Sequence, residues 1–331
     1  MSPPPPHIEA GEQKGEGMKY RSVLTDELSG SLKPGRFAGM LTARTMSFSR
    51  KSIGRSTTAG YRLFPKQRLQ RVHYAIAIAK WKTLTSAQRQ AYKNYADQNK
   101  ISLYNAFLHS YLEALRNDLV LYLALDEKQN TTVKDYSTYT NDGTLSGNPQ
   151  IETGYLDGSL KFDGSDDIVN CGADQTLNFN GSQTFSIIGW FKSSYATDQD
   201  ILSKWSETDC KGYFLKGHFP DNLSFAIGHG DGTYTEVTIP GATLGEWNQI
   251  AIVKSNVILY GYVNGEVTGI RFIRKSIVYP TTNFYLSYPA WTGVYYHGNI
   301  DELRMYKREL SPEEIKAIYD IEKNWHDTGT A

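Results

Sequence analysis

Residues that commonly carry covalent chemistry are present, but not in a catalytic arrangement. The sequence has no Gly-x-Ser-x-Gly nucleophile motif, no His-Glu-x-x-His zinc motif and no phosphate-binding loop. Residues 228–232 read Gly-His-Gly-Asp-Gly, but they lie between predicted strands with no helix after them, which favours a hairpin turn. The seven histidines are scattered and suggest no zinc site. We therefore expect that the protein is not an enzyme.

Large aromatic rings next to polar residues are better candidates for a site. Residues 289–296 form a loop-like stretch with three large rings, and two further rings lie on another predicted rim. Such rings stack on sugars or contact proteins. Because 13% of the residues are aromatic, ordinary surface rings are the alternative interpretation. The candidate ligand-binding residues are Trp205, Tyr213, Trp291, Tyr295 and Tyr296.

A basic segment is the third candidate. Residues 33–100 hold 15 Lys or Arg and a single acid, Asp97. This density suits phosphate contacts, whose affinity falls steeply with salt. It also suits pairing with an acidic protein surface, including that of a second copy, and we favour this protein contact. The predicted basic partner surface comprises Arg62, Arg68, Arg71, Lys80, Lys82, Arg89 and Lys93.

Charge divides the chain into two halves. The formal net charge is zero, from 35 Lys and Arg against 35 Asp and Glu. Residues 1–117 nevertheless carry 19 basic and 7 acidic residues, whereas residues 118–331 carry 16 and 28. Such asymmetry indicates a basic arm that interacts with a partner.

Location and redox state are only loosely constrained. No run of 18 apolar residues is present, so we expect no membrane span. The opening residues, Met-Ser-Pro-Pro-Pro-Pro, lack the apolar region of a signal peptide, so we do not expect secretion by that route. Cys171 and Cys210 could form one disulfide or remain two free thiols.

Three segments position these candidates. Residues 1–60 are rich in Pro, Gly and Ser with few apolar anchors, which predicts an extended basic arm that needs a partner to become ordered. Residues 61–117 have helical spacing, with Thr85 and Ser102 capping the second and third of three helices. Residues 118–331 combine alternating runs with recurrent Asp-Gly and Asn-Gly turns, which predicts a mainly β, antiparallel sandwich.

The last segment resembles the laminin-G-like, concanavalin-A-like jelly rolls. The matching blocks occur in the family's order, although Gln249 stands where the family often has His. The resemblance implies a jelly roll that binds sugars, binds proteins or serves as a structural module. The blocks are Leu121–Asp126, Asp135–Ser137, Asn141–Gly143, Leu160–Gly164, Phe185–Phe191, Trp247–Ala251, Leu259–Gly265, Asn299–Tyr306 and Arg308–Ile315.

The helical segment is similar to a motif of phage and prophage structural proteins. It is more distantly similar to the second and third helices of HMG boxes. The residues that carry the likeness are Trp81–Thr85, Gln88–Tyr92, Tyr95–Ala96 and Tyr104–Phe107. The resemblance implies that these helices serve in the assembly of a particle.

The jelly-roll resemblance also implies a calcium site. Many members hold one ion between the loop after the first strand and an Asp near the end, and Asp135, Asn141, Asp142 and Asp301 are the matching positions. Calcium takes six to eight oxygen ligands, which an Asp-rich turn beside an inward Asp can supply. In the alternative, Asp135 and Asp142 only cap turns and Asp301 accepts bonds from backbone amides.

Some relatives with this architecture are glycanases, which place paired carboxylates on one strand. Residues 299–304 are the nearest stretch, but they lack the first Glu. We also expect Asp301 and Glu302 to point to opposite faces. The sequence therefore predicts no glycosidase. Asp163, Asp166 and Asp167 form a further acidic cluster, which turn chemistry explains.

Three hypotheses result. The leading one is a viral or phage structural protein of the capsid, decoration or host-adhesion type, located in the virion. Its arm and helices would bind copies of itself or other particle proteins, and its sandwich would be displayed. The alternative is a free, calcium-dependent protein that binds surface glycans. The third is a nucleic-acid-binding protein that acts through residues 33–100.

Overall fold

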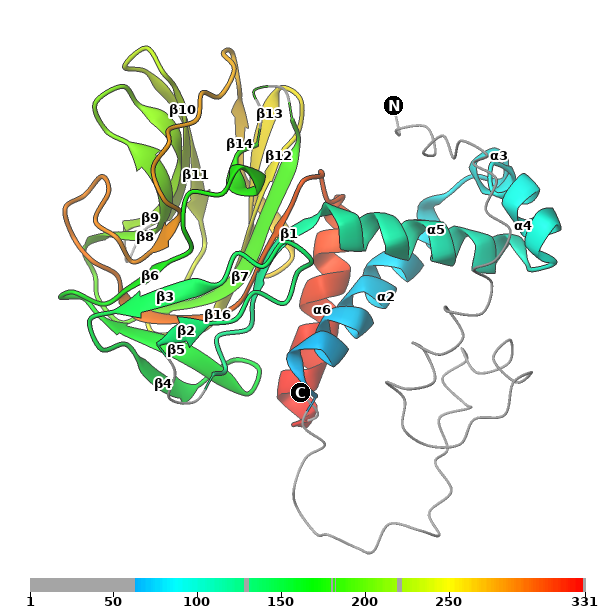
Figure 1. Cartoon of the computed structure of the whole chain (residues 1–331), viewed down its shortest axis with the longest axis horizontal. Helices are drawn as coiled ribbons and strands as arrows, with labels where there is room; N and C mark the ends of the chain where they lie inside the picture. Colours follow the sequence, from blue (N-terminus) through cyan, green and yellow to red (C-terminus); the bar gives the residue numbers. More distant parts are fainter. Residues whose placement is uncertain (1–62, 128–130, 180, 182, 219–221, 330–331) are drawn as a thin grey trace, which may run out of the picture. The chain divides into compact units, whose positions relative to one another are not determined.

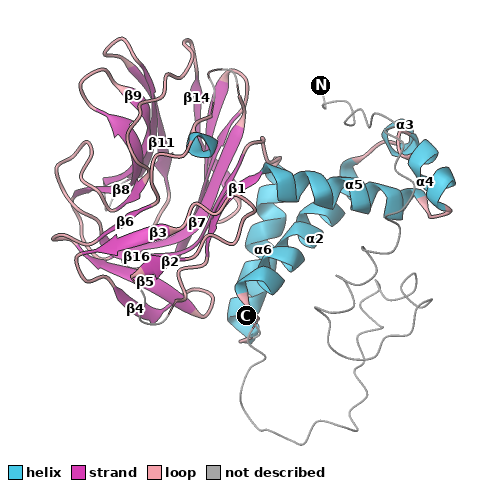
Figure 2. Ribbon diagram, in the orientation of Figure 1, coloured by secondary structure: helices cyan, strands magenta, loops and turns pink. Residues whose placement is uncertain are grey.

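The computed structural model describes residues 63–331, apart from residues 128–130, 180, 182, 219–221 and 330–331 (Figure 1). The predicted arm and Arg62 lie outside the described residues. Within the described part, four α-helices precede two β-sheets, and one further α-helix ends the chain (Figure 2). This order confirms the predicted fold class of a helical region followed by an antiparallel sandwich.

Four helices replace the three that the sequence predicts. Both predicted caps are present: the Thr85 hydroxyl accepts a bond from the amide of Gln88 at 3.2 Å, and the Ser102 hydroxyl accepts one from Asn105 at 3.1 Å. The second predicted helix is interrupted at Tyr92, whose ring packs edge-on against Phe107 at 5.3 Å. The helices are α2 (Pro65–Thr83), α3 (Ser86–Gln90), α4 (Lys93–Asn99) and α5 (Leu103–Asp118).

The sandwich consists of two antiparallel sheets. The first has the strand order β14-β13-β12-β7-β16-β5-β4, with β1 also paired to β16. The second has the order β11-β10-β9-β8-β15-β6-β3-β2. The strands are β1 (Leu119–Leu123), β2 (Thr132–Val133), β3 (Gly143–Ser146), β4 (Gln150–Thr153), β5 (Gly158–Asp163), β6 (Ile168–Asn170), β7 (Phe185–Ser193), β8 (Asp198–Ser206), β9 (Lys211–His218), β10 (Asn222–His229), β11 (Tyr234–Pro240), β12 (Asn248–Lys254), β13 (Ile258–Val263), β14 (Glu266–Phe272), β15 (Tyr285–Leu286) and β16 (His297–Tyr306).

The main core lies between the two sheets. Phe185 of β7 faces Phe225 of β10 across it, with ring centroids 6.1 Å apart. Tyr213 and Leu215 of β9 are fully buried in the same cluster. Because alternate side chains of a strand point to opposite faces, each strand also directs a second set of side chains outward. These outward sets differ in kind between the two sheets.

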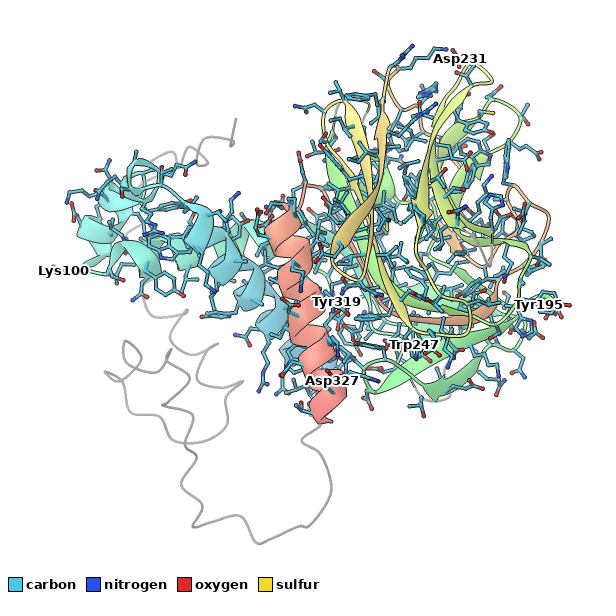
Figure 3. All side chains as sticks on the ribbon, turned by 180° about the vertical axis from the view of Figure 1, so that it is seen from behind. Lys100, Tyr195, Asp231, Trp247, Tyr319 and Asp327 are labelled. Carbon is cyan, nitrogen blue, oxygen red and sulfur yellow. The ribbon has the colours of Figure 1, made fainter. Side chains whose placement is uncertain are left out.

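Helices cover the outer face of the first sheet. Helix α6 (Pro312–Thr328) packs beside α2, and apolar side chains of both join the outward residues of β7 and β12 in a second core. Helix α6 begins with a capping contact, because the Ser311 amide donates to the Glu314 carboxylate at 2.7 Å. Tyr319 of α6 stacks on Trp190 with centroids 5.9 Å apart, and Trp247 lies nearby (Figure 3).

A buried chain of ion pairs joins these helices to the sheet. Arg68 of α2 pairs with Asp126 and, at 2.7 Å, with Glu302 of β16. Arg304 pairs with the same Glu302 and, at 2.6 Å, with Glu322 of α6. Arg68 was predicted to lie on the basic partner surface, and this prediction is wrong. Its side chain is fully buried because acids distant in the sequence surround it.

A β-bulge brings neighbouring acids of β16 together. The register with β7 shifts between Asp301 and Arg304, and Glu302 takes a left-handed φ of 53°. The alternation expected for Asp301 and Glu302 is therefore broken, and both lie in the same buried group of charges. Asp301 accepts a bond from the Leu156 amide at 2.8 Å. Burial raises the pKa of Asp301 well above its usual value, and the charge of Glu302 adds to this effect.

Candidate functional site

The outer face of the second sheet carries aromatic residues instead of helices. On β9, Phe214 lies opposite Ser203 of β8 and Ala226 of β10, so all three point outward. Trp205 of β8 lies two residues further along the same face. Trp205, Phe214 and Ala226 form a small cluster separate from the main core. These outward side chains of β8–β11, together with the loop described next, are called the aromatic face.

A loop folds over this face and is fixed by one carboxylate. Asp200 of β8 is fully buried, and its Oδ2 accepts bonds from the amides of Trp291 and Thr292 at 2.9 and 2.8 Å. The Asp200 amide donates in turn to the carbonyl of Val294 at 3.0 Å. Burial raises the pKa of Asp200, while the two loop amides act in the opposite direction. The carboxylate therefore positions the Trp291 ring.

Trp291 is the centre of the ring cluster. It stacks on Phe214 with centroids 5.4 Å apart and an interplanar angle of 15°. It also meets Trp205 at 5.7 Å and Tyr234 at 5.4 Å, both edge-on. Lys216 lies over the Trp291 ring at 5.9 Å. Trp291 is only partly buried and Tyr234 is 39% exposed, so this cluster has faces available to a ligand.

Polar atoms without a protein partner line the same face. Within the described part of the chain, these buried atoms are Oδ1 of Asp200, Oγ of Ser203, Nε1 of Trp205 and Oγ of Ser224. Buried polar groups are nearly always hydrogen-bonded, so four unpaired ones near one cluster require an explanation. As placed, these atoms are covered by neighbouring side chains, so a ligand on the rings would meet more exposed polar residues such as Tyr234.

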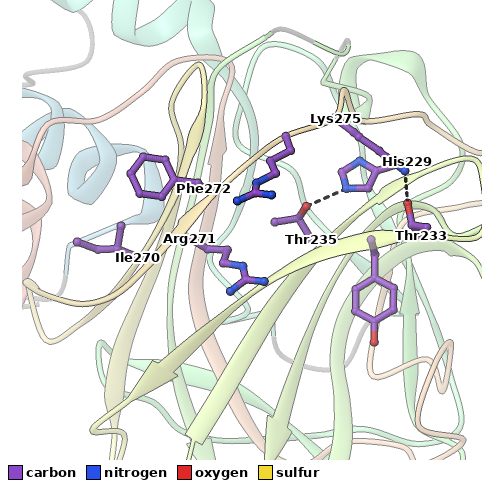
Figure 4. Close-up of a pocket in the computed structure, with 9 residues that line it drawn as sticks. His229, Thr233, Thr235, Ile270, Arg271, Phe272 and Lys275 are labelled. Atoms are coloured by element: carbon purple, nitrogen blue, oxygen red, sulfur yellow. Dashed lines mark hydrogen bonds between the residues drawn. The ribbon is translucent and has the colours of Figure 1, made fainter.

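A hollow of about 540 Å³ adjoins the aromatic face. It lies between β11 and β14, the edge strands of the two sheets. Figure 4 shows Ile270 and Phe272 at the left end of the hollow, Arg271 nearer its centre and His229 at the right end. Its lining residues are His229, Thr233, Tyr234, Thr235, Ile270, Arg271, Phe272, Arg274 and Lys275. Tyr234 thus borders both the hollow and the ring cluster.

The structure separates the five predicted ligand-binding residues. It brings Trp205 and Trp291 together, as described above. Tyr213 and Tyr296, in contrast, are fully buried core residues, so their rings cannot meet a ligand and these two predictions are wrong. Tyr295 is partly buried and forms a bridge with Asp200. The sequence analysis missed Phe214, Tyr234, Lys216 and Asp200, although alternation along β9 would have paired the first and third of these.

The four predicted calcium ligands are all hydrogen-bonded or ion-paired to other protein groups. Asp135 accepts bonds from the amides of Tyr122, Ser137 and Asn141 and from the Ser137 hydroxyl. Asp142 forms an ion pair with Lys134 at 2.8 Å. Asn141 donates to the Val120 carbonyl and to the hydroxyl of Thr176, and Asp301 accepts a bond from the Leu156 amide. As placed, these side chains present no shared set of free oxygens, and calcium binding stays a prediction.

Three other carboxylates lie close together. Of the described residues, only Asp163, Asp166 and Asp167 form a group of potential ligand atoms within 4.8 Å of one another. Asp167 accepts bonds from the amides of Asn148 at 2.6 Å and Asp163 at 3.0 Å. Asp163 accepts a bond from the Ser165 amide at 2.8 Å, which is a turn contact of the kind that the sequence predicts, whereas the Asn148 bond joins two distant segments.

The remaining predicted basic residues lie on α2–α4. Arg71, Lys82 and Lys93 are exposed, and Lys93 pairs with Asp97 at 2.7 Å. Arg89 and Lys80 are partly buried, with the Arg89 guanidinium 4.6 Å from the Trp81 ring centroid. Their partner, protein or nucleic acid, stays a prediction. Cys171 and Cys210 are both free and buried.

The sandwich matches a known family. Residues 163–316 fit the model described as the concanavalin A-like lectin/glucanases superfamily, which confirms the resemblance seen in the sequence. The match covers slightly less than half of the 331 residues. No curated protein sequence matches the chain.

Several solved toxin domains share this fold. The binding domain of Paraclostridial Mosquitocidal Protein 1 superposes with a TM-score of 0.54 at 14% identity, over 62% of this chain and 53% of that one. The binding domain of botulinum neurotoxin DC, solved with rat synaptotagmin II, gives 0.51 at 15% identity over 63% and 52%. The same domain solved with SialylT gives 0.51 at 14% identity over 63% and 52%. This chain therefore spans about half the length of these domains, and the likeness concerns the fold.

None of these matches concerns a virus particle or a nucleic acid, so both of those hypotheses stay predictions. In the described part of the chain, no helix is both long enough and apolar enough to cross a membrane.

Proposed function

We propose that the sandwich is a carbohydrate-binding module whose ligand lies on the aromatic face. The observation that carries the proposal is the partly exposed Trp291 ring, which Asp200 holds over Phe214 and next to the exposed Tyr234. A sugar offers apolar C–H faces together with hydroxyl edges. A partly exposed indole ring with a tyrosine beside it is complementary to both.

The arrangement of the sandwich supports this choice of face. Helices α2 and α6 pack on the outer face of the first sheet, where the outward ring of Trp190 on β7 is buried. One matched toxin domain was solved with two different partners, synaptotagmin II in one structure and SialylT in the other. These partners are properties of that protein, and they illustrate that domains of this fold serve in recognition. The proposal agrees with the second of the three sequence-based hypotheses.

A glycan array probed with the full chain tests the proposal. The variant Trp291→Ala removes the central ring, and Phe64→Ala is the matched control, because Phe64 is a 71% exposed ring on the α2 side. We expect defined glycans to bind the unmodified chain and the control but to lose most of their signal with Trp291→Ala. Binding that survives this substitution, or an array without any signal, would refute the proposal.

The same array tests the predicted calcium dependence. Signals measured with added calcium and with EDTA should differ if Asp135, Asn141, Asp142 and Asp301 exchange their protein donors for an ion. Equal signals under both conditions would refute calcium dependence and leave the aromatic face as the whole site.

A further inference from the structure

We propose that the hollow between β11 and β14 binds the acidic groups, carboxylate or sulfate, of the glycan that stacks on the aromatic face. The inference rests on the proposed function and adds the chemical class of the ligand. It starts from Arg271 and Arg274, which line the hollow and are exposed. Neither has an acidic partner within 4.0 Å among the described residues.

The backbone explains why a hollow exists here. The two edge strands approach each other closely at Gly269, where an added Cβ would lie 2.1 Å from the carbonyl oxygen of Thr238. Toward the other end of the hollow, Lys275 reaches across to Asp231 at 2.6 Å and to Thr233 at 3.1 Å. Between these two contacts, side chains line the space that separates the strands. Arg271 and Arg274 are among them.

The side chain of His229, which lines the hollow, is held by two hydrogen bonds. His229 bonds the carbonyl of Ser276 through Nδ1 at 3.0 Å and the hydroxyl of Thr235 through Nε2 at 2.8 Å. A carbonyl oxygen only accepts, so Nδ1 donates to it. The imidazole is thus held in one orientation, whereas the side chains of Arg271 and Arg274 are exposed to a ligand.

The charge balance of the hollow favours an anion. Lys275 is neutralised by Asp231, which leaves Arg271 and Arg274 as uncompensated cations. A guanidinium presents a planar pair of N–H groups that matches the two oxygens of a carboxylate or sulfate. Tyr234 connects this hollow to Trp291, so one oligosaccharide can stack on the rings and direct an acidic substituent toward the arginines.

Three oligosaccharides of equal length test whether binding depends on sulfate groups, on carboxylate groups or on neither. Heparin hexasaccharide carries sulfates and carboxylates, hyaluronan hexasaccharide carries carboxylates, and chitohexaose is neutral. Calorimetry with the full chain would compare Arg271→Ala/Arg274→Ala with the control Arg116→Ala/Lys323→Ala. The control removes the same charge from exposed positions on α5 and α6. All four side chains are exposed, so we expect unchanged melting temperatures.

We expect the first variant to bind the acidic oligosaccharides about tenfold more weakly or worse, with chitohexaose unaffected and the control unchanged. High salt should weaken acidic binding in the unmodified chain more than in the variant. Loss of heparin binding alone would identify sulfate as the group, and loss of both would include carboxylate.

The two proposals fail in different ways. If chitohexaose binds through Trp291 but the acidic sugars bind equally well with and without the arginines, the inference is overturned and the carbohydrate site stands. If no oligosaccharide binds, the proposed function fails and the inference fails with it. An oligonucleotide that binds as tightly as heparin, with the same dependence on Arg271 and Arg274, would overturn the assignment to glycans.

Discussion

Glu322→Gln should destabilise the protein by about 3–5 kcal/mol, because it breaks a buried ion pair while leaving Arg304 in place. The Glu322 carboxylate accepts bonds from Arg304 at 2.6 Å, from the Trp190 indole at 2.7 Å and from Gln249 at 3.1 Å. Burial raises the pKa of Glu322, so the cost of desolvating its carboxylate already offsets part of the stability that the ion pair contributes. The lower end of the range is therefore expected.

Urea unfolding followed by circular dichroism measures the effect. Asp320→Asn is the matched control, since it removes an exposed acid of the same helix that pairs with Lys316, and it should change stability by about 0.5 kcal/mol or less. A loss below about 1 kcal/mol for Glu322→Gln would refute the conclusion that this network attaches α6.

Four further predictions concern other parts of the molecule. Burial, with Arg304, Arg116 and Arg308 nearby, lowers the pKa of His73 to about 3. The unfolded chain therefore binds the proton more readily, and His73 should reduce the unfolding free energy by roughly 2 kcal/mol between about pH 8 and pH 5. His73→Gln should flatten that part of the stability–pH curve, and an unchanged slope would contradict the assignment. Asp200→Ala removes the acceptor of two loop amides and should cost about 2–4 kcal/mol, with tryptophan fluorescence more readily quenched by acrylamide. An unchanged quenching constant would show that Asp200 does not hold Trp291. Gly212 has φ +97°, and a Cβ there would lie 1.8 Å from the Lys204 carbonyl, so Gly212→Ala should lower stability by about 2–4 kcal/mol. Equal melting curves would argue against that backbone geometry. Cys171 and Cys210 are buried thiols, so both should react with Ellman's reagent only after unfolding, and rapid labelling of the native chain would contradict their burial.

Local patterns predicted the parts of the fold that depend on local physics. The caps at Thr85 and Ser102 follow from local sequence, because a hydroxyl bonds an amide three residues later, within the same stretch of sequence. The sandwich was found because turn residues recur between strands. The order of the strands within each sheet depends on pairings between distant segments, which no local spacing encodes.

The candidate site was predicted only in part, for two physical reasons. Strand β9 carries a large aromatic ring on each face, so its sequence does not show which ring points outward. The choice of Tyr213 instead of Phe214 is therefore an error of one residue. Asp200 acts on Trp291 from 91 positions away, and Arg68 is buried by Asp126, which lies 58 positions away. Contacts of this range require the folded chain.

The two helices that cover the first sheet also determine how the sandwich is presented. The described chain enters through α2 and leaves through α6, and both helices pack on that one sheet. The aromatic face belongs to the other sheet, on the opposite side of the sandwich. The start of α2 and the end of α6 therefore lie on the side of the sandwich that is opposite the aromatic face. A tether at either end would leave the ring of Trp291 pointing away from its anchor, toward whatever surface the molecule approaches.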